Sequence, residues 1–205
     1  MTTRIGRYGS MVRTLLSKIW LFLWRWKVTQ DEPIPDRCVM IAAPHSSNWD
    51  FPLTLAMARV EGIDIRWLGK AQMFNPVLGP FFRALGGISV TRASSNGLVG
   101  DLAAEFARHD RLALVVPAEG TRSAVDYWKS GFYQIASQGN VPIVLAYVDR
   151  STRSGGFGPV ITPSGDVAAD MDRIRAFYAG KIGLKPNRFN VPRLREEDSA
   201  TTSTD

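Results

Sequence analysis

The chain has 205 residues, 45% of them hydrophobic, which is enough for one substantial core and too little for two full domains. Its 25 Lys and Arg against 19 Asp and Glu give a net charge of +6, which favours an anionic partner: nucleic acid, an anionic membrane surface or a phosphorylated substrate. The single cysteine, Cys38, excludes a disulfide framework and a cysteine-based zinc site, and its apolar surroundings predict a buried, inert thiol.

The first segment, residues 1–34, contains an amphipathic helical pattern over residues 10–27. Basic residues interrupt it, so it has neither the apolar stretch of a secretory signal nor the ~20 apolar residues of a spanning helix, and we expect an intracellular protein. Its tryptophans and basic face predict a helix in the membrane interface; packing on the protein's own core is the alternative. Leu21 and Trp24 lie off the apolar stripe, which favours the interface. The stripe comprises Val12, Leu15, Leu16, Ile19, Phe22, Leu23 and Trp26.

Residues 35–190 alternate short apolar runs with helical patterns and are predicted to form one domain. This alternation predicts an α/β fold with a central mixed, largely parallel sheet flanked by helices. The Gly- and Ser-rich stretch 150–158 predicts a loop, and the polar residues 191–205 predict a disordered tail. Strands are predicted at 38–43, 63–68, 88–90, 112–116 and 142–148. Helices are predicted at 51–60, 96–108 and 131–138.

Two histidines are available as a general base. His109 lies in a charged stretch at the end of a predicted helix, which indicates a solvated surface residue. His45 follows a predicted strand and precedes a helix, the position at which sites form in α/β proteins. Asp50 comes five residues later, about 500° around a continuous helix, so the two side chains can meet only across a loop. Pro44 and the three cap-forming residues after His45 favour such a loop.

A histidine held by a carboxylate has a fixed tautomer and a stabilised imidazolium, so its other nitrogen can accept a proton from an attacking hydroxyl. His45 and Asp50 are therefore candidate catalytic residues. The alternative is structural: Asp50 joins Ser47 in a helix-capping box, and His45 bonds to a backbone carbonyl. A His-x4-Asp spacing by itself leaves both interpretations open.

A second group of polar residues follows another predicted strand and consists of Glu119, Gly120, Thr121 and Arg122. Arg122 can bind phosphate oxygens with two hydrogen bonds, Thr121 can add another, and Gly120 lets a ligand approach. Glu119 can accept a substrate hydroxyl or hold Arg122, and an ordinary polar turn with an ion pair is the alternative. Arg92 ends a further short strand, and two arginines at strand ends predict one anionic pocket.

In this order, the segments resemble the motifs of the glycerophospholipid acyltransferase family, in particular its small bacterial 1-acylglycerol-3-phosphate acyltransferases. The similarity extends over more than half of the chain. The four motifs match, in chain order, His45 and Asp50, Gly86 and Arg92, Glu119 to Arg122, and Val141 to Val144. Two departures are Pro44, where the family has Asn, and Pro117-Ala118, where it has Phe-Pro. Neither removes a catalytic group.

The resemblance implies that His45 deprotonates an acceptor hydroxyl, which attacks an acyl thioester directly, while Asp50 orients the imidazole. It implies acyl-CoA or acyl-ACP as donor and a lysophospholipid as acceptor, above all 1-acyl-sn-glycerol-3-phosphate, giving phosphatidic acid. We expect neither a cofactor nor a metal, and a peripheral or monotopic position at the cytoplasmic face of the cell membrane. The glycerol phosphate would be held by Arg92, Glu119, Gly120, Thr121 and Arg122.

Other functions are open. The acceptor could be another lysolipid or a glycolipid, or the protein could be a lipid hydrolase, although no Gly-x-Ser-x-Gly elbow supplies a serine nucleophile. A non-catalytic protein that binds anionic lipid at the membrane surface is a third alternative. We expect no nucleic-acid partner, because the basic residues do not form a stripe with interleaved aromatics. The aromatic segment 73–82 predicts an acyl tunnel or bilayer contact, or else a hairpin or short helix in the core.

Overall fold

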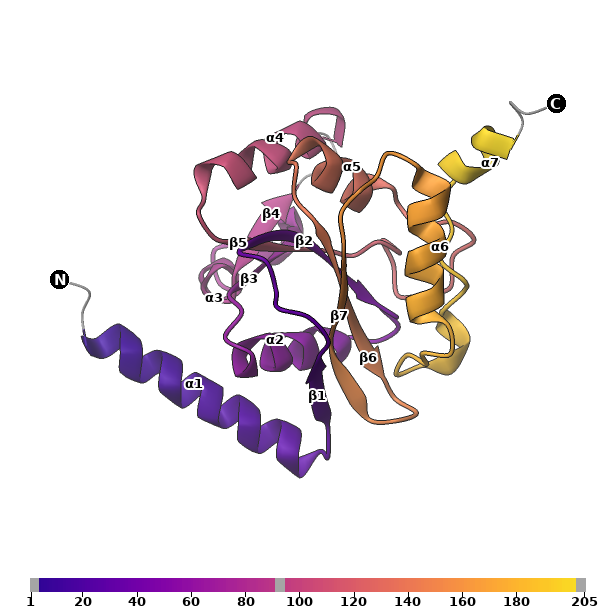
Figure 1. Ribbon diagram of the computed structural model, residues 1–205. Coiled ribbons are helices and arrows are strands. Elements are labelled where there is room, and N and C mark those ends of the chain that lie inside the picture. The colour runs from indigo at the N-terminus through magenta and orange to yellow at the C-terminus, as the bar shows by residue number, and fades with distance from the viewer. Residues whose placement is uncertain (1–3, 91–94, 202–205) are drawn as a thin grey trace.

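The computed structural model describes residues 4–90 and 95–201 and forms a seven-stranded sheet in the order β1-β7-β6-β2-β5-β3-β4 (Figure 1). Neighbouring strands are parallel except for the antiparallel pair β6 and β7. This arrangement confirms the predicted mixed, largely parallel sheet. The strands are β1 Lys27–Gln30, β2 Arg37–Ala43, β3 Ile65–Lys70, β4 Gly87–Val90, β5 Leu112–Val116, β6 Ile143–Asp149 and β7 Ser154–Ile161.

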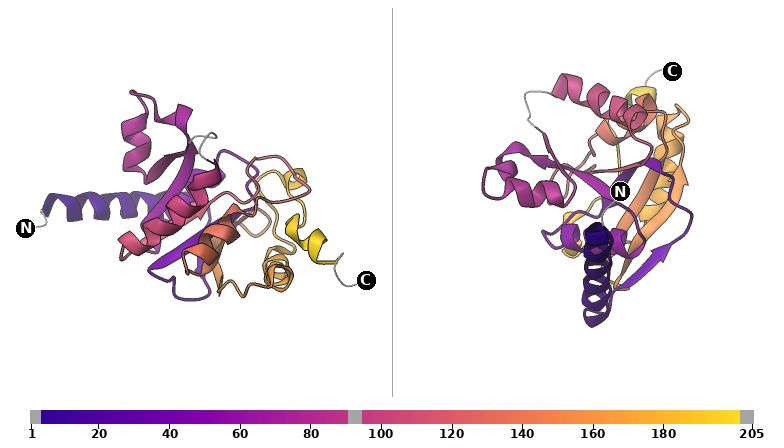
Figure 2. Two further views of the ribbon diagram at one scale, coloured as in Figure 1. Left: turned by 90° about the horizontal axis from the view of Figure 1, so that it is seen from above. Right: turned by 90° about the vertical axis from the view of Figure 1, so that its left-hand side faces the viewer.

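Helices cover both faces of the sheet (Figure 2). α2 and the end of α1 pack on one face, and α4, α5 and α6 pack on the other. The helices are α1 Arg4–Leu23, α2 Asp50–Val60, α3 Gly79–Ala84, α4 Ser95–Arg108, α5 Gly131–Gln138, α6 Val167–Tyr178 and α7 Glu196–Thr201, with short 3-10 turns η1 Ala71–Phe74 and η3 Pro186–Arg188.

The central strand β2 contributes to both core layers. Its side chains alternate, so that Val39 and Ile41 pack under α4, α5 and α6, while Cys38 and Met40 pack under α2. All four are fully buried. A parallel strand covered on both faces is a continuous apolar run rather than an alternating one. Burial also raises the pKa of the Cys38 thiol to about 12, as expected for an inert cysteine.

The predicted loop at residues 150–158 is confirmed for 150–153, which form a turn, and is wrong for 154–158, because β7 begins at Ser154. This strand is rich in glycine because its neighbours leave no room for side chains. A Cβ on Gly156 would lie 1.8 Å from the carbonyl oxygen of Thr29 in β1, and one on Gly158 would lie 2.2 Å from the Phe177 ring of α6. Glycine therefore marks close approach of backbone and ring here, not a flexible connection.

The predicted disordered tail, residues 191–205, differs from the structure as far as residue 201; residues 202–205 lie outside the described residues. Leu194 is fully buried, and α7 follows it. The Arg175 guanidinium lies 2.6 Å from the Glu197 carboxylate, and Tyr127 donates a 2.7 Å hydrogen bond to Asp198. These contacts come from distant elements, so the composition of the segment itself does not predict them.

α1 packs on the body by the side opposite its apolar stripe. Ser17 and Leu21 are buried, and Leu21, which lies off the predicted stripe, is only 3% exposed. By contrast, Phe22 is 80% and Leu23 is 70% exposed on the stripe. Packing on the protein's own core is therefore wrong for the stripe from Val12 to Leu23 but holds for Trp26, which packs against the core after α1 ends; the membrane role of the stripe stays a prediction. Among the described residues, no helix combines the length and hydropathy that crossing a bilayer requires.

The aromatic segment 73–82 is divided between core and surface. Phe74 is buried and packs against Trp67 and Phe82, with ring centroids 6.0 and 6.1 Å away. Val77 is 84% and Phe81 is 58% exposed. The expected core packing therefore holds for one side of the segment, while the other side leaves apolar surface open to a partner.

Candidate active site

The two candidate motifs meet because β2 and β5 are parallel neighbours. Ile41 pairs with Val116, so the carboxyl ends of both strands lie at the same edge of the sheet. The backbone N–H of His45, just beyond β2, donates to both carboxylate oxygens of Glu119, just beyond β5, at 2.9 and 3.2 Å. Parallel pairing thus brings together residues that are 74 positions apart in the chain.

His45 and Asp50 lie side by side, as predicted, across a loop that ends where α2 begins. Nδ1 of His45 is 3.3 Å from Oδ2 of Asp50. The same oxygen accepts 2.7 Å hydrogen bonds from the backbone N–H groups of Ser46 and Ser47. The capping contact of the structural alternative is therefore present together with the His–Asp pair, and it fixes the carboxylate that the imidazole faces.

The imidazole is accessible while its carboxylate is not. The His45 side chain is 28% exposed and that of Asp50 is 6% exposed. Because Nδ1 faces Asp50, Nε2 is the nitrogen that can take a proton from a substrate. The second Asp50 oxygen, Oδ1, is buried and has no hydrogen-bond partner in the described part of the chain. An unpaired buried acceptor is costly, and catalytic sites are among the few places where it is retained.

Glu119 is a second buried carboxyl group beside the imidazole, and it is 4% exposed. Burial is the main cause that raises its pKa, to about 8; the hydrogen bond from the N–H of His45 opposes this shift, and the charge of Asp50 adds to it. Over the described residues, Glu119 makes no ion pair with Arg122, so the expected turn with an internal ion pair is wrong. Its partner is instead the backbone of the histidine loop.

Gly120 and Gly86 are required by backbone geometry. Gly120 has φ of +68° and donates its N–H to the carbonyl of Pro117 at 3.0 Å, which turns the chain after β5. Gly86 has φ of +86°, and a Cβ there would lie 2.3 Å from the carbonyl oxygen of Ile65. β4 ends at Val90. The predicted phosphate ligand Arg92 lies outside the described residues.

A hollow of about 470 Å³ adjoins the His45 loop. The residue directly after His45, Ser46, is part of its wall, and Thr121 and Arg122 line it as well. Its wall contains two further cations that were not predicted from the sequence, Lys185 and Arg188. The only signal for them was a pair of basic residues around Pro186, outside every motif. The histidine loop and the Glu-Gly-Thr-Arg turn therefore share one basic cavity.

Comparison with known proteins shows the family of the chain. The sequence profile of the acyltransferase family matches residues 25–177, about three quarters of the chain. This chain belongs to the acyltransferase family. Among curated protein sequences, none matches it.

The acyltransferase also resembles a solved structure, that of the 1-acyl-sn-glycerophosphate (LPA) acyltransferase PlsC from Thermotoga maritima. The two have a TM-score of 0.60 and 17% identity, over 85% of this chain and 78% of the other. At that identity the likeness extends to the fold. It supports the α/β arrangement independently of the site residues.

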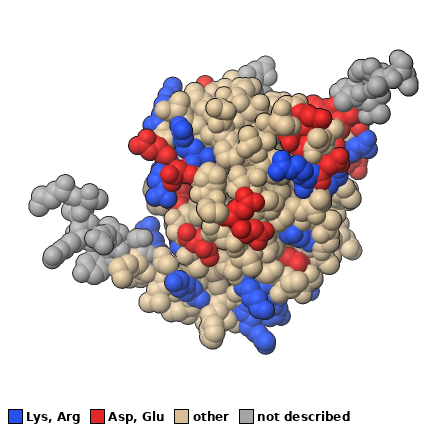
Figure 3. All heavy atoms as spheres, in the orientation of Figure 1, with Lys and Arg blue, Asp and Glu red and all other residues tan. Residues whose placement is uncertain are grey.

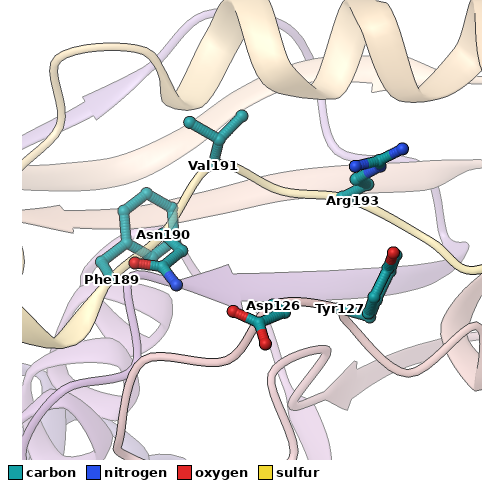
Figure 4. Close-up of a pocket in the computed structure, with 6 residues that line it drawn as sticks. All are labelled: Asp126, Tyr127, Phe189, Asn190, Val191 and Arg193. Carbon is teal, nitrogen blue, oxygen red and sulfur yellow. The ribbon is translucent and has the colours of Figure 1, made fainter.

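A second hollow in the acyltransferase, of about 580 Å³, lies between the loop at residues 126–127 and the segment 189–193 (Figure 4). It is larger than the cavity beside the histidine loop, but no residue of that loop lines it, whereas Ser46 to Trp49, directly after His45, line the smaller cavity. Figure 4 shows Tyr127 and Arg193 at one end and Phe189 and Asn190 at the other. Because no candidate base reaches it, we place the site at the smaller cavity.

The other groups of the acyltransferase that could act chemically lie elsewhere. His109 is exposed and lies 3.1 Å from Glu105 on the same helix, which confirms the predicted surface position. Within the described ranges, no cluster of three or more His, Cys, Asp or Glu side chains could hold a metal ion. His45 is therefore the histidine that the fold places beside a cavity.

Proposed function

We propose that this acyltransferase moves a fatty acyl group from an acyl thioester, acyl-CoA or acyl-ACP, to the free hydroxyl of 1-acyl-sn-glycerol-3-phosphate, giving phosphatidic acid. The observation that carries the proposal is the 3.3 Å contact between His45 Nδ1 and a buried Asp50 carboxylate, beside a cavity lined by Arg122. The family supports acyl transfer, and the activity stated for the Thermotoga protein supports this acceptor.

In the proposed reaction, Nε2 of His45 takes the proton of the acceptor hydroxyl while the hydroxyl oxygen attacks the thioester carbonyl carbon. The C–O ester bond forms, the C–S bond breaks, and the departing thiolate takes the proton from the imidazolium. Asp50 holds Nδ1 and stabilises the imidazolium while it carries the proton. A thioester is already activated, so positioning and base catalysis are sufficient without an acyl-enzyme.

The phosphate of the acceptor would lie in the cavity against Arg122. A guanidinium matches phosphate oxygens with two parallel hydrogen bonds, the hydroxyl of Thr121 can add a donor, and Gly120 lets the ligand approach. Glu119, partly protonated at neutral pH by its raised pKa of about 8, can donate as well as accept a hydrogen bond. Arg92 completes the proposed set by its place after β4.

We further propose that α1 binds this acyltransferase to the anionic, cytoplasmic face of the cell membrane. Its exposed stripe supplies apolar contact, and Arg25 and Lys27, where α1 leads into β1, are exposed. Arg153 joins them, because its carbonyl accepts the N–H of Lys27. Figure 3 shows Lys and Arg along the lower part of the visible face, with further groups at its upper left and upper right. Such a helix would bring the site to its lipid substrate.

The test of the proposed reaction is mass spectrometry of products formed from mixed lysolipids and acyl-CoA. We expect phosphatidic acid from the wild type, and His45→Ala should lower turnover by about 10²–10⁴-fold while lysolipid binding is kept. A different acylated product would reassign the acceptor to another lysolipid or a glycolipid. Free fatty acid without acylated product would indicate a hydrolase.

A non-catalytic lipid-binding protein would show no product with any donor, and His45→Ala would then leave its effects in the cell unchanged. Membrane binding is tested separately by flotation with vesicles that contain phosphatidylglycerol. We expect Leu15→Gln with Phe22→Gln to abolish flotation. Val191→Gln, a change at another exposed apolar residue away from α1, is the control and should float like the wild type.

A further inference from the structure

The segment after α6 crosses directly over the histidine loop. The backbone N–H of Lys185 donates a 3.0 Å hydrogen bond to Oγ of Ser46, which is fully buried. A Cβ on Gly183 would lie 2.7 Å from the same oxygen, so only glycine permits this approach. These contacts hold Lys185 and the following turn, η3, at the rim of the cavity, where the side chains of Lys185 and Arg188 form part of the wall.

The cavity is strongly basic. Its wall contains the cations Arg122, Lys185 and Arg188 and no acidic side chain. All three are exposed, and in residues 4–90 and 95–201 none of them forms an ion pair. Some exposed arginines elsewhere are neutralised, for example Arg111, which lies 3.1 Å from Asp36. Three unneutralised cations around one hollow make a site for an anion with several oxygens.

We propose that Lys185 and Arg188 act with Arg122 as a phosphate-binding subsite of the substrate cavity. The proposal rests on the proposed acyl transfer and extends it, because both cations lie beyond residue 177, where the family profile ends. Two substrates carry phosphate: the monoester of the lysolipid acceptor and the phosphates of acyl-CoA. The ligand chemistry is the same for both, and kinetics with substrates that lack phosphate separates them.

The experiment compares the wild type with Lys185→Gln/Arg188→Gln in steady-state assays in which each substrate is varied. The backbone N–H of residue 185 remains, so the contact with Ser46 is kept. We expect the KM of one substrate to rise about 10–100-fold, with kcat changed less than about threefold. The difference should disappear with monoacylglycerol if the acceptor phosphate is bound, or with an acyl N-acetylcysteamine thioester if the phosphates of acyl-CoA are bound.

Controls make the result specific to charge. Lys185→Arg/Arg188→Lys should restore the KM, and Arg111→Gln, at the opposite end of β5, should leave it unchanged. If the glutamine variant is folded and its KM values for both substrates equal those of the wild type, the proposed subsite is overturned. A binding assay keeps this outcome separate from failure of the proposed function. In a His45→Ala background, titration with glycerol 3-phosphate or CoA should show weakened binding, and unchanged affinity for both would also overturn the proposal.

Discussion

The two loops that meet at the site are built in opposite ways. In the loop after β2, Ser46 and Asp50 are buried, and backbone N–H groups hold the carboxylate at 2.7 Å. In the loop after β5, Glu119 is buried against the backbone N–H of His45, while Thr121 and Arg122 are exposed. The first loop is fixed before substrate arrives, and the second presents Arg122, which has no ion-pair partner among the described residues.

This difference separates two tasks of an acyltransferase. A base must be held in one geometry, because proton transfer requires hydrogen-bond contact with the attacking group. A phosphate clamp must stay open until the ligand enters, and the ligand itself then supplies the missing charge. Substitutions in the first loop should therefore lower kcat, and those in the second should raise KM.

The largest effect is expected at Asp50. Asp50→Asn should lower kcat by roughly 10²–10⁴-fold, because the amide cannot stabilise the imidazolium. Its oxygen can still accept the N–H groups of Ser46 and Ser47, so the variant should stay folded. Steady-state kinetics with a thermal melt checks this. A folded variant with normal kcat would mean that Asp50 only caps α2.

A smaller effect is expected at Arg122. Arg122→Gln removes a charged hydrogen-bond donor worth about 1.5–3 kcal/mol, so the KM for the phosphate-bearing substrate should rise about 10–100-fold. Titration of the phosphorylated lysolipid measures the change, with Arg122→Lys as a partial rescue. An effect on kcat alone would contradict the proposal that the second loop acts on KM and the first on kcat.

Glu119 should link stability to pH. Its carboxyl has a pKa of about 8 in the folded protein, against an ordinary value of 4.5. Between pH 4.5 and pH 8, the folded state therefore keeps a proton that the unfolded state has released. Stability should therefore fall as pH rises toward 8, by at most about 1.4 kcal/mol per unit, and level off above it. Melting curves from pH 5.5 to 9 should show a weaker fall for Glu119→Gln. Parallel curves would contradict the buried, proton-bearing carboxyl.

The smallest effect is expected at Gly120. Gly120→Ala should destabilise the protein by about 1–2 kcal/mol, because its φ of +68° strains a side-chain-bearing residue. The matched control is Gly100→Ala in α4, where no atom lies within 4 Å of the added Cβ and the helix should gain about 0.5–1 kcal/mol. Chemical denaturation measures both. Shifts of the same sign would show that backbone strain does not shape the second loop.

Local patterns were sufficient for the central strands of the sheet and for the choice of His45 as the candidate base. Strands such as β2 and β5 are continuous apolar runs, and the residues after them carry the polar groups, so position along the chain predicted which side chains meet. The same approach failed at β7 and at residues 191–201. In β7, the Thr29 backbone and the Phe177 ring leave no room for side chains at Gly156 and Gly158. In the C-terminal segment, Leu194 is buried by elements that are distant in the chain.

Periodicity alone determined that α1 has an apolar stripe, and the motifs alone determined that His45 and Asp50 form the candidate base. Only the tertiary structure decided that Leu21, not the stripe, faces the body, and that Lys185 and Arg188 reach the cavity. The physical reason is the range of the interactions. Helical spacing and strand ends are properties of neighbouring residues, whereas a cation 140 positions after His45 is placed by the packing of Gly183 and Lys185 against Ser46.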